Sequence, residues 1–139
     1  MNHRLRLWLT LFQLAAGLCD TSTGVLLIAA PAFTLGLMGL TIVPQPVAFV
    51  RYIGVFVFSV GLTYLWAALR WPLNERAVMV WSTQWKITAL IRMLVALFVL
   101  WQVATGAIES RWIMVALSDG MFAAIQILGL AKGWLERAG

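Results

Sequence analysis

Residues 85–103 read WKITALIRMLVALFVLWQV, and after Lys86 this run contains a single charged side chain, Arg92. As an α-helix with a rise of 1.5 Å per residue it would be about 28 Å long, close to the thickness of the hydrocarbon core of a bilayer. Because lipid offers no hydrogen-bond partners to an unpaired backbone, the run predicts a membrane-spanning helix. It indicates the fold class and places a charge inside the membrane.

The composition of the whole chain agrees with this interpretation. Of the 139 residues, 63% are hydrophobic and 11% are charged, whereas soluble domains carry about 25% charged residues. This excludes a disordered chain and a water-soluble enzyme of ordinary build, and the single cysteine excludes a disulfide scaffold. Apolar runs bounded by charge, proline and tryptophan predict spans at residues 8–28, 48–69, 85–103 and 112–130. We therefore expect one domain over residues 1–139, an all-α integral membrane protein with a four-helix bundle.

The first span resembles a secretory signal peptide in two respects. Arg4 and Arg6 precede it, and residues 30–32 read APA, which is similar to a cleavage site. However, the run is longer than the apolar region of a signal peptide, which has about 7–15 residues, and it contains Asp20. We expect an uncleaved membrane span.

Basic residues outside the spans or at their edges are divided unequally between two sides. Seven fall in the terminal segments and the middle loop: Arg4, Arg6, Arg70, Arg76, Lys86, Lys132 and Arg137. The other two loops contain one, Arg111. Because Lys and Arg concentrate on the cytoplasmic side of membrane proteins, both termini are predicted to be cytoplasmic. This face would attract anionic lipid, and we expect no nucleic-acid partner.

The eight tryptophans cluster near the predicted membrane boundaries. The inner boundary has Trp8, Trp66, Trp71, Trp81, Trp85 and Trp134, and the outer one has Trp101 and Trp112. Amphipathic indole rings settle at the level of the headgroups, so we interpret these residues as membrane anchors. The alternative is that one or two of them stack on a cofactor.

Two connecting segments are more than minimal turns. Residues 31–46 are uncharged and apolar, with proline at both ends. Because this segment is too short to span the membrane, we expect a loop that lies in the outer interface. Residues 74–83 predict a short helix capped by Asn74, which either runs along the inner surface or extends the third span.

Four ionisable side chains fall inside the spans: Asp20, Arg51, Arg92 and Asp119. A charge at the bilayer centre costs about 2.5–3.5 kcal/mol on insertion scales, so such residues usually face the bundle interior and pair. Counted along each helix from the predicted outer ends, the four lie at depths of about 5–16 Å. Long arginine side chains can extend along apolar surface and so compensate for such differences in depth. We expect a charge-balanced quartet in the outer half of the membrane.

Gln13 and Gln126 predict a second, deeper polar layer. Each lies seven residues from an aspartate, in helices that run in opposite directions, so both fall about 21–22 Å from the outer ends of their spans. Gly17 and Gly24 share a face of the first span with Gln13. Small residues beside polar ones are typical of close helix contacts in lipid. We therefore expect the polar side chains to face inward.

Three interpretations of this polar network stay open. The first is a structural network that fixes helix register, as buried polar pairs do in other proteins. The second is a route for protons or ions, since such routes also use intramembrane carboxylates. The third is a polar patch that recognises a quinone or a lipid headgroup.

Residues that bind redox cofactors are scarce. His3, in the N-terminal tail, is the only histidine, so His-ligated haem, His-ligated chlorophyll and a His/carboxylate metal site are not expected. The sequence also lacks a glycine-rich phosphate loop and a nucleophile elbow. We expect no metal, no cofactor of its own and no catalytic activity of its own. Contact with lipid, quinone or a partner's pigment stays open.

The chain resembles the small four-helix bacterial membrane proteins grouped as DoxX-like. The residues that carry the resemblance cover most of the chain: Gly17, Asp20 and Gly24 leading to Pro31, then Arg51 with Gly54, and Gly61 with Tyr64. The resemblance implies a four-helix bundle in the bacterial inner membrane. It also implies a link to membrane oxidoreductases that pass electrons to quinone.

These observations lead to one functional hypothesis and two alternatives. We expect a non-catalytic accessory subunit of a larger bacterial membrane complex, linked to respiratory or photosynthetic electron transport. Its contacts with other membrane-protein subunits would involve an outer set and an inner set: Phe33, Leu37 and Met38 in the loop, and Trp81 and Trp85 on the inner side. The alternatives are a small transporter coupled to protons or solutes and a quinone-handling subunit of a membrane oxidoreductase.

Overall fold

The computed structural model describes residues 3–70 and 73–139, and the predicted anchor Trp71 lies outside them. Its helices are α1 (His3–Ala29), α2 (Pro31–Leu37), α3 (Val47–Ala68), α4 (Glu75–Ala104), the 3-10 helix η1 (Ser110–Trp112), α5 (Ile113–Ala131) and α6 (Trp134–Ala138). Within the described part of the chain, four helices are long and apolar enough to cross a membrane. The prediction of an all-α, multi-pass membrane bundle is confirmed.

The third span is longer than predicted at its N-terminal end. The backbone continues as one helix from Glu75, and the side chain of Asn74 accepts a hydrogen bond from the Ala77 backbone N–H (2.9 Å). This contact caps the helix because it satisfies one of the N–H groups that lack an intrahelical partner. The segment 74–83 therefore extends α4 and is not a separate surface helix.

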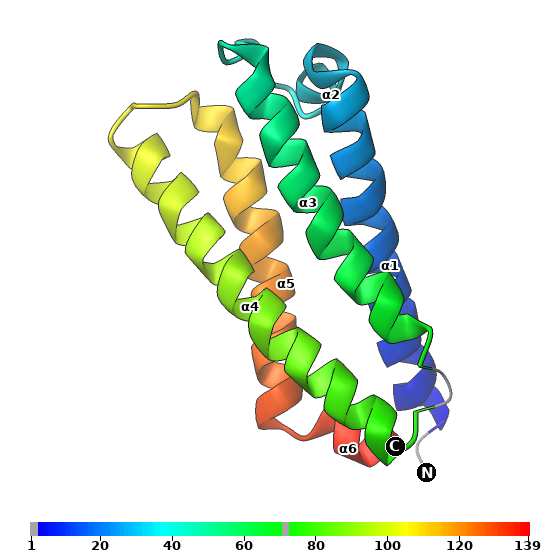
Figure 1. Cartoon of the computed structure of the whole chain (residues 1–139). Helices are drawn as coiled ribbons and strands as arrows, with labels where there is room; N and C mark the ends of the chain where they lie inside the picture. Colours follow the sequence, from blue (N-terminus) through cyan, green and yellow to red (C-terminus); the bar gives the residue numbers. More distant parts are fainter. Residues whose placement is uncertain (1–2, 71–72) are drawn as a thin grey trace.

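The apolar segment after α1 is partly helical. α2 begins at Pro31, where the missing N–H and fixed φ of proline are tolerated, and the chain leaves it through Gly39 at φ 77°. Leu35 and Leu40 are buried with Leu27 of α1 and Val50 of α3. α2 thus packs against the α1–α3 pair at one end of the bundle (Figure 1).

Glycines let α1 and α3 pack closely along their length. A Cβ on Gly24 would lie 2.5 Å from the backbone nitrogen of Phe58, and a Cβ on Gly61 would lie 2.5 Å from that of Thr21. Real Cβ atoms essentially never come so close, so only glycine fits at these crossings. The predicted close approach at the small residues of the first span is confirmed.

The bundle consists of two antiparallel pairs, α1 with α3 and α4 with α5. The pairs meet at the end of the molecule that carries α6 and diverge toward the end that carries α2 (Figure 1). A cluster of buried side chains fills the α6 end: Leu9, Ala67, Leu73, Ala77, Trp81, Trp85, Leu135 and Ala138. Because this cluster unites α1, α3, α4 and α6, it joins the two pairs at that end of the molecule.

Candidate functional site

One arginine joins all four spans. Arg92, in the middle of α4, donates from Nη2 to Asp20 of α1 and from Nη1 to Asp119 of α5. Its Nε donates to the Tyr64 hydroxyl of α3 over 3.2 Å. We call Asp20, Arg92 and Asp119 the ionic layer. The predicted pairing of Arg92 with both aspartates is therefore present in the structure.

Aromatic rings enclose the guanidinium group of Arg92. Its central carbon lies 4.6 Å from the ring centre of Phe122 and 5.5 Å from that of Tyr64. Such contacts stabilise a cation that has lost its water shell. With these rings and its three hydrogen-bonded nitrogens, Arg92 is buried, whereas the side chains of Asp20 and Asp119 stay 13% and 18% exposed.

The structure does not bring Arg51 into this layer, so the predicted quartet is wrong in that member. Arg51 is exposed and forms no ion pair with any described residue. The contact between α1 and α3 explains the difference, because Gly61 is the residue of α3 that lies against the backbone of Asp20. Arg51 is ten residues away on α3, which is about 15 Å along the helix. The ionic layer therefore has two carboxylates and one guanidinium.

The predicted second layer is present and is larger than expected. Gln13 is fully buried; its Nε2 donates to the Tyr64 carbonyl (3.1 Å) and to Gln84 Oε1 (3.0 Å), and its Oε1 accepts from the Trp85 indole (2.8 Å). Gln126, also buried, donates to the Thr88 hydroxyl (2.8 Å).

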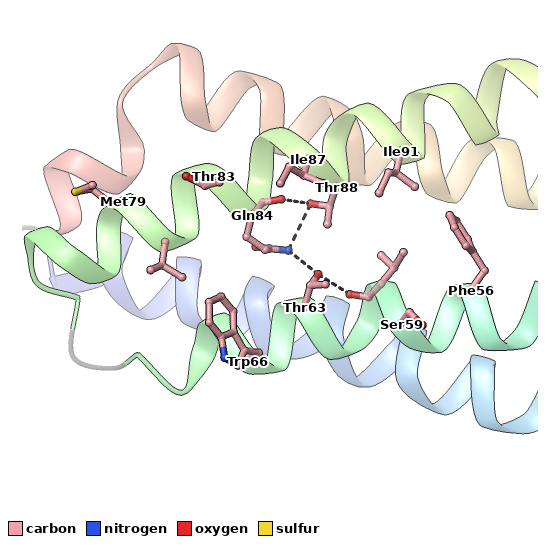
Figure 2. A pocket seen from close by; sticks show the side chains of 12 residues that line it. Phe56, Ser59, Thr63, Trp66, Met79, Thr83, Gln84, Ile87, Thr88 and Ile91 are labelled. Atoms are coloured by element: carbon pink, nitrogen blue, oxygen red, sulfur yellow. Dashed lines mark hydrogen bonds between the residues drawn. The ribbon is translucent and has the colours of Figure 1, made fainter.

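We call Gln13, Gln84, Thr88 and Gln126 the amide layer. Figure 2 shows Gln84 and Thr88 on α4 and Thr63 on α3, linked by hydrogen bonds. Sequence reasoning missed Gln84, although it lies four residues before Thr88 and eight before Arg92, a spacing that puts all three on one helix face.

Trp81 and Trp85 do not lie on the surface, so their predicted role as partner contacts is wrong. Both are fully buried, and the Trp81 indole donates to the Ala67 carbonyl over 2.7 Å. The reason is the N-terminal extension of α4, which places both rings in the cluster at the α6 end. By contrast, Trp66 and Trp101 are exposed on the bundle, as membrane anchors would be.

A cavity of about 460 Å³ opens where the two helix pairs diverge. We call it the α2-end cavity. Most of its wall is apolar or aromatic, with Tyr52, Phe56, Phe98 and Trp112 among the lining residues. Asp20, Arg92 and Asp119 line it as well. The charged groups of the ionic layer are therefore accessible from the space between the pairs.

A second cavity of about 540 Å³ lies between α3 and α4, closer to the α6 end. Figure 2 shows its lining side chains, which include Gln84 and Thr88 of the amide layer among apolar residues and other hydroxyl side chains. Val60 and Ile91 line both cavities. The two cavities are therefore neighbours along the same α3–α4 seam.

Polar contacts tie the loops together at the diverging end. Glu109 accepts hydrogen bonds from the Thr41 N–H (3.1 Å), the Thr41 hydroxyl (2.9 Å) and the Ile42 N–H (3.3 Å), and Arg111 donates to the Gly39 carbonyl (2.5 Å). Desolvation raises the pKa of Glu109, but the bonds from Thr41 and Ile42 and the charge of Arg111 lower it by more, so it lies below its ordinary value. We call these contacts the loop clasp.

The three predicted contact residues of the outer loop differ in their surroundings. Phe33 and Leu37 are 61% and 67% exposed on α2, whereas Met38 is partly buried against the cluster around Leu35. In the described residues, no group of three or more His, Cys, Asp and Glu side chains could hold a metal ion.

No protein-family model, curated protein or solved structure was found to match the chain. The resemblance to DoxX-like proteins therefore stays a hypothesis. What the protein does has to be argued from the ionic layer, the cavities and the exposed surfaces.

Proposed function

We propose that the protein is a non-catalytic binding subunit that holds a membrane-dissolved ligand in the α2-end cavity, against the ionic layer. The observation that carries this proposal is the position of Asp20 and Asp119, whose partly exposed carboxylates line an otherwise apolar cavity. Among the interpretations of the polar network, it is the recognition patch that these contacts favour.

The size and lining of the cavity support a ligand of moderate size. Ligand sites are usually clefts of about 300–1,000 Å³ with apolar walls and a few convergent polar groups, and a volume of about 460 Å³ falls within that range. Charged side chains inside a membrane are costly, so they are usually kept for a function. The ligand would have an apolar body that fills the cavity and a polar group that meets the ionic layer. A quinone or a lipid are members of this broad class.

We also propose that the protein lies in the bacterial inner membrane with both termini in the cytoplasm, because seven basic residues are on that side. The α2 end then faces outward, and the cavity lies in the outer half of the membrane. In a Cys19→Ser background, a cysteine at Ser110 should react with a membrane-impermeant reagent from outside. One at Glu136 should react only after lysis; both positions are exposed. The reverse labelling pattern would contradict the orientation.

A second candidate function is that of an accessory subunit in a larger complex linked to electron transport. The observation that favours a contact with such a complex is α2, which buries Leu35 and presents Phe33 and Leu37 on its other side. The link to electron transport rests on the resemblance to DoxX-like proteins. Large exposed apolar side chains at a membrane interface suit either lipid or another membrane-protein subunit. Replacing both Phe33 and Leu37 with Ser should reduce co-purification with the partner complex while the bundle stays folded. Unchanged co-purification would remove this surface from consideration.

A matched pair of variants tests the binding function. Val60 lines both cavities, whereas Val55, on the same helix, is half exposed and lines neither. We expect wild type and Val55→Phe, extracted into nanodiscs without detergent, to carry the same small molecule in mass spectra. Val60→Phe should lose it. Equal content in all three folded proteins, or no bound molecule in any, would contradict the proposal.

A further inference from the structure

The ionic layer lacks one positive charge. Its two carboxylates face one guanidinium, so with both carboxylates ionised its formal charge is −1. The residue that was expected to balance it, Arg51, is exposed and about 15 Å away along α3. An uncompensated charge in a low-dielectric region is unfavourable, so a group that supplies a positive charge there would be bound favourably.

The atoms of the ionic layer that remain available for hydrogen bonds are mainly acceptors. Asp20 uses Oδ2 and Asp119 uses Oδ1 to bind Arg92. The second oxygen of each carboxylate receives no hydrogen bond from any described residue, although a carboxylate can accept several. All three nitrogens of Arg92, in contrast, already donate. The layer thus offers acceptors to the cavity and has few donors left.

Aromatic side chains surround the same space. Tyr52, Phe56, Phe98 and Trp112 line the α2-end cavity. The faces of aromatic rings attract cations, and groups of such rings bind ammonium-type ligands in other proteins. The lining therefore favours a positively charged ligand, as the carboxylates do.

We infer that the ligand of the α2-end cavity is a lipophilic monovalent cation whose charge lies beside the oxygens of Asp20 and Asp119 that do not bind Arg92. This inference rests on the proposed binding function and names the class of its ligand. A neutral hydroxyl compound could use the same acceptors, but it would leave the charge of the layer uncompensated. A lipophilic anion would be repelled.

Two probes of nearly the same shape and opposite charge test the inference. Tetraphenylphosphonium and tetraphenylborate are titrated into wild-type protein in lipid nanodiscs, and the partitioning into empty nanodiscs is subtracted. We expect one saturable site for the cation and none for the anion. Asp119→Asn should weaken cation binding by about tenfold or more, because the layer becomes neutral. Glu136→Gln, which removes an acid at the exposed α6 segment, should bind as wild type does.

A second measurement needs no change in the ionic layer. The cation should raise the unfolding temperature of wild type and of Val55→Phe, but not that of Val60→Phe, whose cavity is filled. The anion should have no such effect on any of the three. This measurement decides the matter if Asp119→Asn does not fold.

The contrary results separate this inference from the proposal on which it rests. Saturable binding of both ions, lost in Val60→Phe, would overturn the selection for cations and leave the cavity as a binding site. No saturable binding of either ion would also overturn it. In that case the proposed function would still stand if wild type carries a neutral molecule that Val60→Phe lacks, and it would fall if wild type carries none.

Discussion

The two polar layers of the bundle lie one above the other but differ in chemistry. On α1 and on α5, seven residues separate the amide layer from the ionic layer, which is about 10 Å along each helix. Gln13 is fully buried, and both its amide nitrogen and its amide oxygen form hydrogen bonds with other helices. Asp20 and Asp119 share one cation and are partly exposed to a cavity. Gln13 is satisfied within the bundle, whereas the ionic layer leaves one oxygen of each carboxylate available to a further group.

This comparison assigns a structural role to the amide layer and a ligand-binding role to the carboxylates of the ionic layer. Buried amides that join helices fix their register, because any shift would leave polar groups without partners in a medium that offers none. Arg92 has both roles, since it joins α4 to the three other spans and also neutralises one carboxylate.

The largest expected loss of stability follows from Arg92→Leu. Its removal leaves two carboxylates close together without a cation, and breaking a buried pair in this way costs about 3–5 kcal/mol in soluble proteins. We expect a strong decrease in folded yield and in the midpoint of thermal unfolding in mild detergent. Arg137→Ala, at the exposed C-terminal segment, serves as the control. If both variants fold equally well, Arg92 is not the centre of the bundle.

Gln13→Leu should have the next largest effect. It leaves the Trp85 indole N–H and Gln84 Oε1 without their partner, and unsatisfied buried polar groups cost about 1–3 kcal/mol each. We expect the free energy of unfolding, measured by denaturant titration in micelles, to decrease by about 2–4 kcal/mol. Ligand binding in the α2-end cavity should persist in the folded fraction.

Gln126→Leu offers a matched comparison within the same layer. Gln126 Oε1 is buried and has no hydrogen-bond partner, while Nε2 has one partner, Thr88. The substitution removes one hydrogen bond and also the orphaned acceptor, so the loss should be about 1 kcal/mol or less. A loss equal to that of Gln13→Leu would show that the count of hydrogen bonds does not govern the stability of the amide layer.

The smallest effect is expected from the loop clasp, which lies at the exposed end beyond the ionic layer. In Glu109→Gln, the distribution of distances between spin labels at Ile42 and Ser110 should become broader at neutral pH. Because the folded-state pKa of Glu109 is below its ordinary value of 4.5, the clasp of wild type is complete above that value. It should weaken as the pH falls through the folded-state pKa. Broadening of the wild-type distance already at pH 6 would contradict this.

Much of the fold could be predicted from the sequence, for physical reasons. Spans follow from length and apolarity, because the bilayer excludes an unpaired backbone. The layers containing Gln13 and Asp20 followed from spacing alone, since seven residues are two helical turns and keep both side chains on one face.

The errors arose where contacts between helices determine the position of a side chain. Arg51 was assigned a depth from the end of its span, but the offset between α1 and α3 is set by the glycine contact at Gly61. Trp81 and Trp85 carry the same indole as the exposed tryptophans, and composition does not distinguish a buried ring from an anchor. The loop clasp joins Glu109 to Thr41 and Ile42, which are 68 and 67 positions away in the sequence, and no local pattern indicates such a contact.

The most direct test of the division between the layers is to measure stability and binding together in Asp119→Asn. Because the layer has an excess of negative charge, the substitution should change the free energy of unfolding by less than about 1 kcal/mol. It should nevertheless weaken binding of the lipophilic cation by about tenfold or more. Gln13→Leu, in contrast, should destabilise the bundle and leave cation binding in the folded fraction unchanged. If Asp119→Asn instead destabilises the bundle as Arg92→Leu does, and the folded fraction binds the cation like wild type, both layers are structural and the account is wrong.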